Sequence, residues 1–113
     1  MNPDTGYTIQ DARASSLQRR WKDKAYERAA AFYSQAVADQ LGPRRQLDQI
    51  DSQLVESMVA AFLERGDAPS TINRKCSALW AMLADAAAQD WIKRVPAMPA
   101  RQKPRAQARQ QGA

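Results

Sequence analysis

The side chains best suited to bind a charged ligand are concentrated in one short stretch of the sequence. They are Ser70, Thr71, Asn73, Arg74, Lys75 and Ser77. Hydroxyl, amide and cationic groups all donate hydrogen bonds to phosphate oxygens, and an arginine can also contact a guanine edge. If the stretch begins a helix, the first-turn amides and the positive end of the helix dipole favour a phosphate at the same place. These residue types therefore indicate a surface for a nucleic-acid backbone.

The element that must position these side chains is predicted to be a helix from Ser70 to about Gln89. Pro69 disfavours helical geometry at the residue before it, and Ser70 can cap the first turn. At 100° per residue the apolar side chains share one face. They are Ile72, Cys76, Leu79, Met82, Leu83 and Ala86. The simpler interpretation is an amphipathic helix whose polar face is only solvated.

A second group of cations lies in a longer helical pattern, predicted over residues 15–41. Apolar residues recur there every three or four positions, including Leu17, Trp21 and Phe32. The first half of the pattern carries Arg19, Arg20, Lys22, Lys24 and Arg28 against only Asp23 and Glu27. We expect these five cations to be phosphate partners, on a concave, positive surface shared with the polar face of the 70–89 helix.

The remaining elements complete a small all-α helical bundle, with three to four main helices over residues 15–99. One more helix is predicted from Asp51 or Ser52 to about Arg65, and it is acidic or neutral. Residues 1–14 are expected to form a flexible N-terminal arm, and residues 100–113 a basic linker or tail. The expected shared core is Trp21, Phe32, Leu54, Met58, Phe62, Ile72, Leu79, Leu83 and Trp91.

Length and composition narrow the function classes. The 113 residues suit one domain, and 17 lysines and arginines against 12 acidic residues give a net charge of +5. Such a balance favours nucleic acid or an acidic surface as partner. Histidine is absent and there is one cysteine, so we expect no catalytic site, metal or cofactor. The sequence has no apolar run of membrane-spanning length and no signal-peptide pattern, so we expect a cytoplasmic protein without a membrane partner. The isolated domain is expected to be a monomer.

The order of residues carries a family resemblance over roughly residues 17–99. The most specific piece is Thr71-Ile72-Asn73-Arg74-Lys75, followed by Ser77-Ala78-Leu79, Met82-Leu83, Ala86, Trp91-Ile92 and Pro96. Upstream, Leu41-Gly42, Leu47, Ile50-Asp51, Val55, Phe62-Leu63 and Gly66 are compatible. This pattern resembles the core-binding domain of tyrosine recombinases, the phage-integrase family.

The resemblance implies a SAM-like DNA-binding module that clamps the recombination-site duplex during DNA integration and recombination. Double-stranded DNA would be its partner, together with other integrase protomers in a full-length protein. The catalytic tyrosine of the family belongs to a second domain, which this sequence does not contain. The chain departs from the family pattern at Cys76, Trp80, Asp90 and Val95. The alternative is a helical protein-interaction or oligomerisation module with a solvated basic surface.

Overall fold

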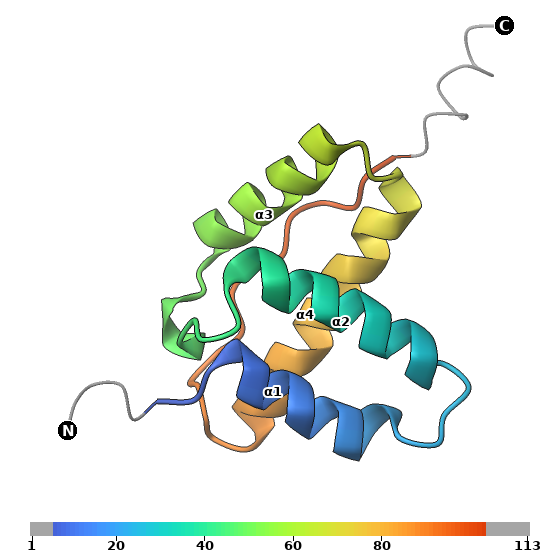
Figure 1. Ribbon diagram of the computed structural model, residues 1–113. Coiled ribbons are helices and arrows are strands. Elements are labelled where there is room, and N and C mark those ends of the chain that lie inside the picture. The colour runs from blue at the N-terminus through green and yellow to red at the C-terminus, as the bar shows by residue number, and fades with distance from the viewer. Residues whose placement is uncertain (1–5, 104–113) are drawn as a thin grey trace, which may run out of the picture.

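Four α-helices form the computed structural model, which describes residues 6–103 (Figure 1). They are α1 (Ile9–Ser16), α2 (Glu27–Leu41), α3 (Ser52–Arg65) and α4 (Pro69–Ala88). A π-helical turn, η2 (Leu17–Trp21), continues α1, and a 3₁₀ turn, η3 (Leu47–Gln49), precedes α3. Residues 6–103 contain no strand, so the predicted small all-α bundle is confirmed. The parts of the predicted arm and tail at 1–5 and 104–113 lie outside the described residues.

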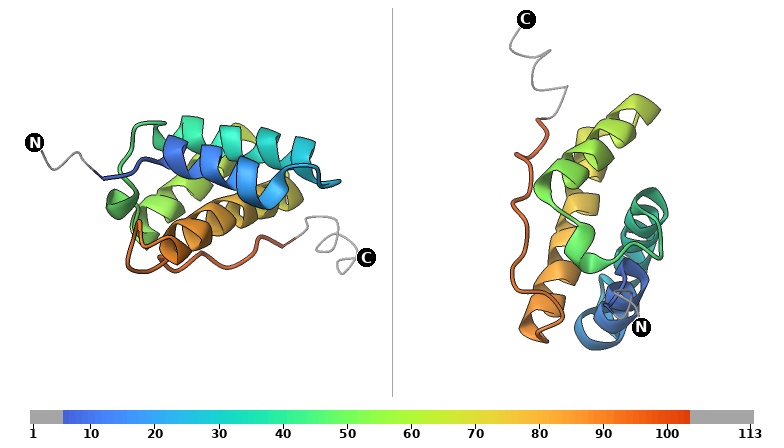
Figure 2. Two further views of the ribbon diagram at one scale, coloured as in Figure 1. Left: turned by 90° about the horizontal axis from the view of Figure 1, so that it is seen from below. Right: turned by 90° about the vertical axis from the view of Figure 1, so that its left-hand side faces the viewer.

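Helix α4 is the longest element, and the others are arranged around it. Helices α1 and α2 lie together on one side of α4, and the segment after residue 91 runs along its other side (Figure 2). Helix α3 packs against α4 and also contacts α2. None of the helices within residues 6–103 is both long enough and apolar enough to cross a membrane.

The predicted N-terminal arm is wrong from Ile9 onward, where α1 begins. Thr8 caps this helix: its hydroxyl accepts from the amide of Asp11, whose carboxylate accepts from the amide of Thr8. Ile9 is fully buried, and its amide donates to the carbonyl of Arg45 at 2.9 Å. The reciprocal cap and the burial of Ile9, Ala12 and Ser16 stabilise this helix, although it is too short to show a sustained apolar period.

The predicted 15–41 helix is broken between Trp21 and Glu27. The chain leaves η2 at Lys22, and Asp23 has a positive φ of 62°. The break changes which face of α2, the second half of the predicted helix, is buried. Ala30, Ser34 and Val37 now point inward, while Phe32, two residues or about 200° from Ala30, is 67% exposed. Phe32 is therefore not a core residue, contrary to the prediction.

Most of the other predicted core residues are confirmed. Trp21, Met58, Phe62, Ile72, Leu79 and Leu83 are buried, and Leu54 and Trp91 pack half-buried against them. Trp91 folds back after Asp90, which adopts a positive φ of 64°, and its ring stacks on Tyr7 with centroids 3.9 Å apart.

The boundaries of α3 and the end of α4 agree with the sequence prediction. The Asp51 carboxylate accepts from the amide of Leu54, and Gly66 ends α3 in the left-handed region. The start of α4 differs by one position from the prediction. Ala68 is the N-cap and Pro69 the first helical residue, so Ser70 lies inside the first turn and does not cap it.

Candidate nucleic-acid interface

Arg74 is the exposed cation of the 70–77 stretch. It lies in the second turn of α4, and its guanidinium approaches the hydroxyl of Tyr33 on α2 at 3.5 Å. Ser70 is exposed one turn earlier, and Thr71 is half-buried between them. A loosely held guanidinium close to the hydroxyls of Ser70 and Thr71, near the amide end of a 20-residue helix, is able to bind a phosphate group.

Lys75 does not belong to this exposed set, so its assignment as a DNA contact is wrong. It is 5% exposed, and its Nζ donates to the Asp67 carboxylate at 2.6 Å. The same ammonium lies 4.2 Å from the centroid of the Phe62 ring. Lys75 thus ties the start of α4 to the end of α3, and its charge is already neutralised within the fold.

We expect Asp67→Ala to lower the free energy of unfolding by about 1–3 kcal/mol, because it leaves a buried ammonium without its carboxylate. Lys75→Met keeps the apolar stem and removes the charge, so its cost should be smaller. Urea unfolding of both variants gives the comparison. An equal or larger loss in Lys75→Met would contradict the structural role assigned to the pair.

Arg20 is also engaged within the fold. Its Nε and one terminal nitrogen donate to the two carboxylate oxygens of Asp85 at 2.9 and 2.7 Å, and Ser16 donates to the same carboxylate at 2.8 Å. This bidentate pair fixes η2 against the second half of α4. Arg20 therefore has a structural partner that the sequence alone did not indicate.

The Asp85 network predicts a pH effect. Partial burial disfavours the charged carboxylate, but the bonds from Arg20 and Ser16 outweigh it and hold the pKa of Asp85 below its usual value. The ionised group therefore stabilises the fold above about pH 4, and that contribution is lost as the pH falls through the folded-state pKa. We expect Asp85→Asn to be less stable than wild type at pH 7. The difference in stability between the two proteins should shrink on acidification, which thermal unfolding can follow. A difference that stays constant with pH would show that ionisation of Asp85 does not stabilise the fold.

The other four cations predicted to contact phosphate in the 15–41 segment are exposed. They are Arg19 on η2, Lys22 and Lys24 in the 22–26 loop, and Arg28 in the first turn of α2. The loop, the start of α2 and the start of α4 all lie towards the same side of the molecule, on the right in Figure 1. We call Lys22, Lys24, Arg28 and Arg74 the basic side. Arg19 lies apart from it, near Asp85 and Gln89.

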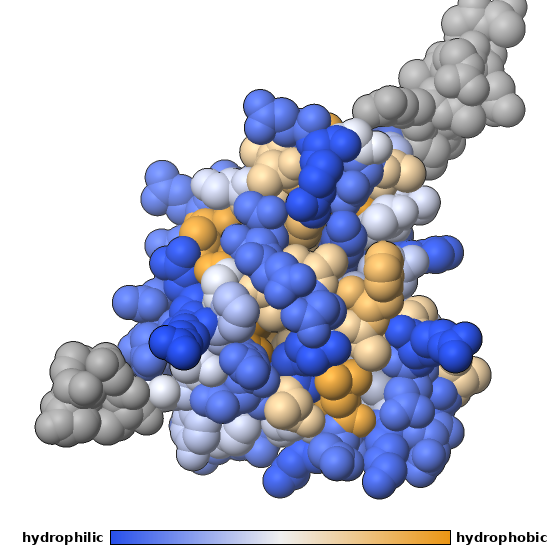
Figure 3. All heavy atoms as spheres, in the orientation of Figure 1, coloured by the Kyte–Doolittle hydropathy of each residue, from blue (hydrophilic) through white to orange (hydrophobic). Residues whose placement is uncertain are grey.

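The basic side is a dispersed group of charges. Residues 74 and 85 are eleven positions apart on α4, which corresponds to about 16 Å along the helix. Arg19 and Arg20, which lie beside Asp85, are therefore far from Arg74 at the start of α4. Asp23 and Glu27 also lie among the cations of the loop and α2. Hydrophilic residues cover most of the face seen in Figure 3, with small hydrophobic groups between them. Arg19 and Arg20 therefore lie apart from the start of α4, and the cations expected on one surface are divided between two places.

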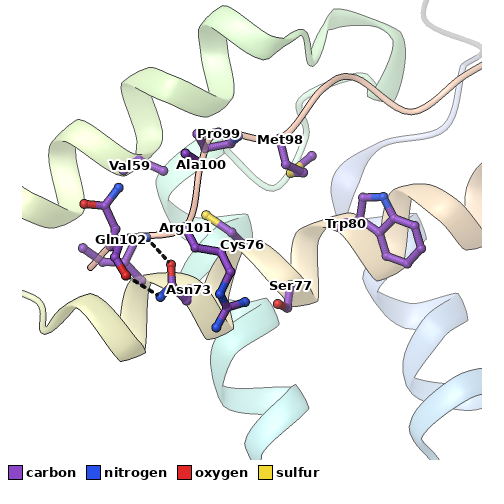
Figure 4. Close-up of a pocket in the computed structure, with 11 residues that line it drawn as sticks. Val59, Asn73, Cys76, Ser77, Trp80, Met98, Pro99, Ala100, Arg101 and Gln102 are labelled. Carbon is purple, nitrogen blue, oxygen red and sulfur yellow. Dashed lines mark hydrogen bonds between the residues drawn. The ribbon is translucent and has the colours of Figure 1, made fainter. Parts of the chain in front are cut away.

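Asn73 and Ser77 face the C-terminal segment. The Asn73 side chain makes two hydrogen bonds with the backbone of Gln102: its Nδ2 donates to the carbonyl at 3.0 Å, and its Oδ1 accepts from the amide at 2.8 Å (Figure 4). Ser77 is exposed but lines the same cavity as Arg101. Residues 100–103, expected to belong to a free tail, therefore lie against α4.

Two partners in this region had no signal in the sequence, namely Tyr33 beside Arg74 and Gln102 beside Asn73. For Lys75 the signal was present, because it is three residues after Ile72 and four before Leu79, on the apolar side of the helix. Within residues 6–103, no group of histidine, cysteine and acidic side chains could hold a metal ion. Comparison with known proteins gave no matching family model, no matching curated protein and no matching solved structure.

Proposed function

We propose that this chain is a DNA-binding module of the kind found as the SAM-like core-binding domain of tyrosine recombinases. In this proposal the basic side contacts the phosphates of a duplex, and catalysis belongs to another domain. The observation that carries the proposal is the exposed Arg74 at the start of α4, within the family-like residue string and on the same side as Lys22, Lys24 and Arg28. The net charge of +5 supports the same class of partner.

Lys75 is buried and Arg20 is paired with Asp85, so fewer cations are available to contact DNA than the sequence predicts. The phosphate contacts reduce to the four residues of the basic side, with Ser70 and Thr71 supplying short positioning bonds. Few contacts imply weak binding by one module acting alone. A second domain joined to it would raise the affinity through effective concentration.

A protein-interaction module remains the second candidate, because several large apolar side chains within residues 6–103 are exposed, most of all two aromatic ones. Phe32 on α2 and Trp80 on α4 are 67% and 49% exposed. Aromatic side chains of this kind are enriched at protein interfaces. This candidate predicts binding that depends on Phe32 and Trp80 and is insensitive to the basic side.

The test is the affinity of a mixed-sequence duplex for the double variant Arg28→Ala/Arg74→Ala. Removing two phosphate contacts should weaken binding and reduce the magnitude of the log–log salt slope by about 2. The single variants Arg74→Ala and Arg44→Ala form the matched comparison, because each removes one charge and Arg44 is an exposed cation of the loop between α2 and α3. Equal losses in Arg74 and Arg44 variants would contradict the assigned interface, since the effect would then come from net charge alone.

A further inference from the structure

Residues 98–103, here called the strap, cover one side of the first half of α4. Met98 packs against the core, and Gln102 is half-buried through its two backbone bonds to Asn73. A cavity of about 260 Å³ remains beneath the strap, lined by Val59 on α3, by Cys76 and Trp80 on α4, and by the strap itself (Figure 4). The strap is therefore held over an incompletely filled space.

The contacts of the strap with α4 are few. Ala100, Arg101 and Lys103 are exposed, and the side-chain hydrogen bonds between the strap and the rest of residues 6–103 are the two at Asn73. A segment with few buried contacts and no regular structure opens locally at low cost in free energy. Opening would release the carbonyl oxygen and one N–H of the Asn73 amide at the same time.

We propose that the strap is a reversible cover that competes with DNA for the Asn73 face of α4. The inference rests on the proposed function, because Asn73 and Ser77 lie on the turns that also carry Arg74. While the strap is closed, the Asn73 amide is committed to Gln102 and a phosphate cannot approach that face. DNA contacts the Asn73 face, in addition to the basic side, only in the open form, so closure of the strap lowers the apparent affinity.

Gln102 offers a matched pair of variants because both of its hydrogen bonds with Asn73 use the Gln102 backbone. Gln102→Pro removes the amide that donates to Asn73, whereas Gln102→Ala keeps both bonds. Neither change alters the charge of the strap, so Arg101 and Lys103 contribute equally in both proteins. Met98→Ser loosens the strap independently, by removing its apolar anchor.

The first measurement, without DNA, is the rate at which a thiol reagent modifies Cys76, the one cysteine of the chain. Burial raises the pKa of the Cys76 thiol, so the covered thiol reacts slowly. Loss of one hydrogen bond should raise the rate about two- to tenfold in Gln102→Pro, with a similar rise in Met98→Ser and none in Gln102→Ala. An unchanged rate in Gln102→Pro would show that the Asn73 bond does not hold the strap, and would overturn the inference.

The second measurement is the affinity of the same proteins for a mixed-sequence duplex at low salt. Gln102→Pro and Met98→Ser should bind more tightly than wild type, by at most the factor seen in thiol reactivity. Faster thiol labelling with unchanged or weaker DNA binding would overturn the competition but leave the proposed function intact. Absence of salt-dependent DNA binding in every protein would overturn the proposed function, and the competition with it.

Discussion

Replacing Leu79 with alanine is expected to lower the free energy of unfolding by about 2–5 kcal/mol. Leu79 is fully buried at the middle of α4, the helix around which the others are arranged. Its side chain shares the core with Ile72, two turns earlier on the same face of the helix, and with Leu83, one turn later. Removal of three heavy atoms there loses their burial and leaves a cavity that the surrounding helices can only partly close.

Phe32→Ala is the matched control, because the sequence pattern assigns both residues to the core and the structure separates them. Phe32 is 67% exposed, so its truncation should change the unfolding free energy by about half a kcal/mol or less. Urea unfolding of the two variants measures both effects. A small loss for Leu79→Ala together with a large loss for Phe32→Ala would contradict the break between α1 and α2.

The elements that the sequence predicts well are those with local start and stop signals. Asp51 caps α3 and Gly66 ends it, and Gly42 adopts a positive φ after α2. Each signal acts through backbone groups within a few residues, so it is independent of the rest of the fold. The apolar period of α4 is likewise local and placed Ile72, Leu79 and Leu83 in the core.

The break at residues 22–26 could not be predicted in this way. The apolar residues on both sides of it keep a helical spacing, so the pattern reads as continuous across the loop. Packing decides the outcome, since Arg20 and Ser16 both bind Asp85 on α4 and α2 then returns along the other helices. A contact between residues 65 positions apart, such as Arg20 and Asp85, cannot be recognised from the local spacing of apolar residues.

The candidate site was predicted in part for the same reason. Residue type indicated which side chains can bind phosphate, and Arg74 and Ser70 are exposed as the prediction requires. Whether a cation is free depends on its tertiary partner, which for Lys75 is Asp67. The cover over Asn73 comes from Gln102, 29 positions away. These partners are brought together by the tertiary fold, so they could not be predicted from the sequence.

A steep dependence of DNA binding on salt is the second large expected effect. The basic side offers four exposed cations, with Asp23 and Glu27 close to them in sequence. Neutralisation of about three or four phosphates gives a log–log slope of about −3, at roughly −0.9 for each phosphate. Raising the salt fourfold should then weaken binding about 40- to 150-fold.

Titration of a labelled duplex of mixed sequence into the wild-type protein at about 50 and 200 mM salt tests the DNA-binding proposal most directly. The basic side predicts measurable binding at the lower concentration and a loss of about 40- to 150-fold at the higher one. Absence of binding at 50 mM salt, or an affinity that does not change between the two concentrations, would contradict it and favour the protein-interaction module.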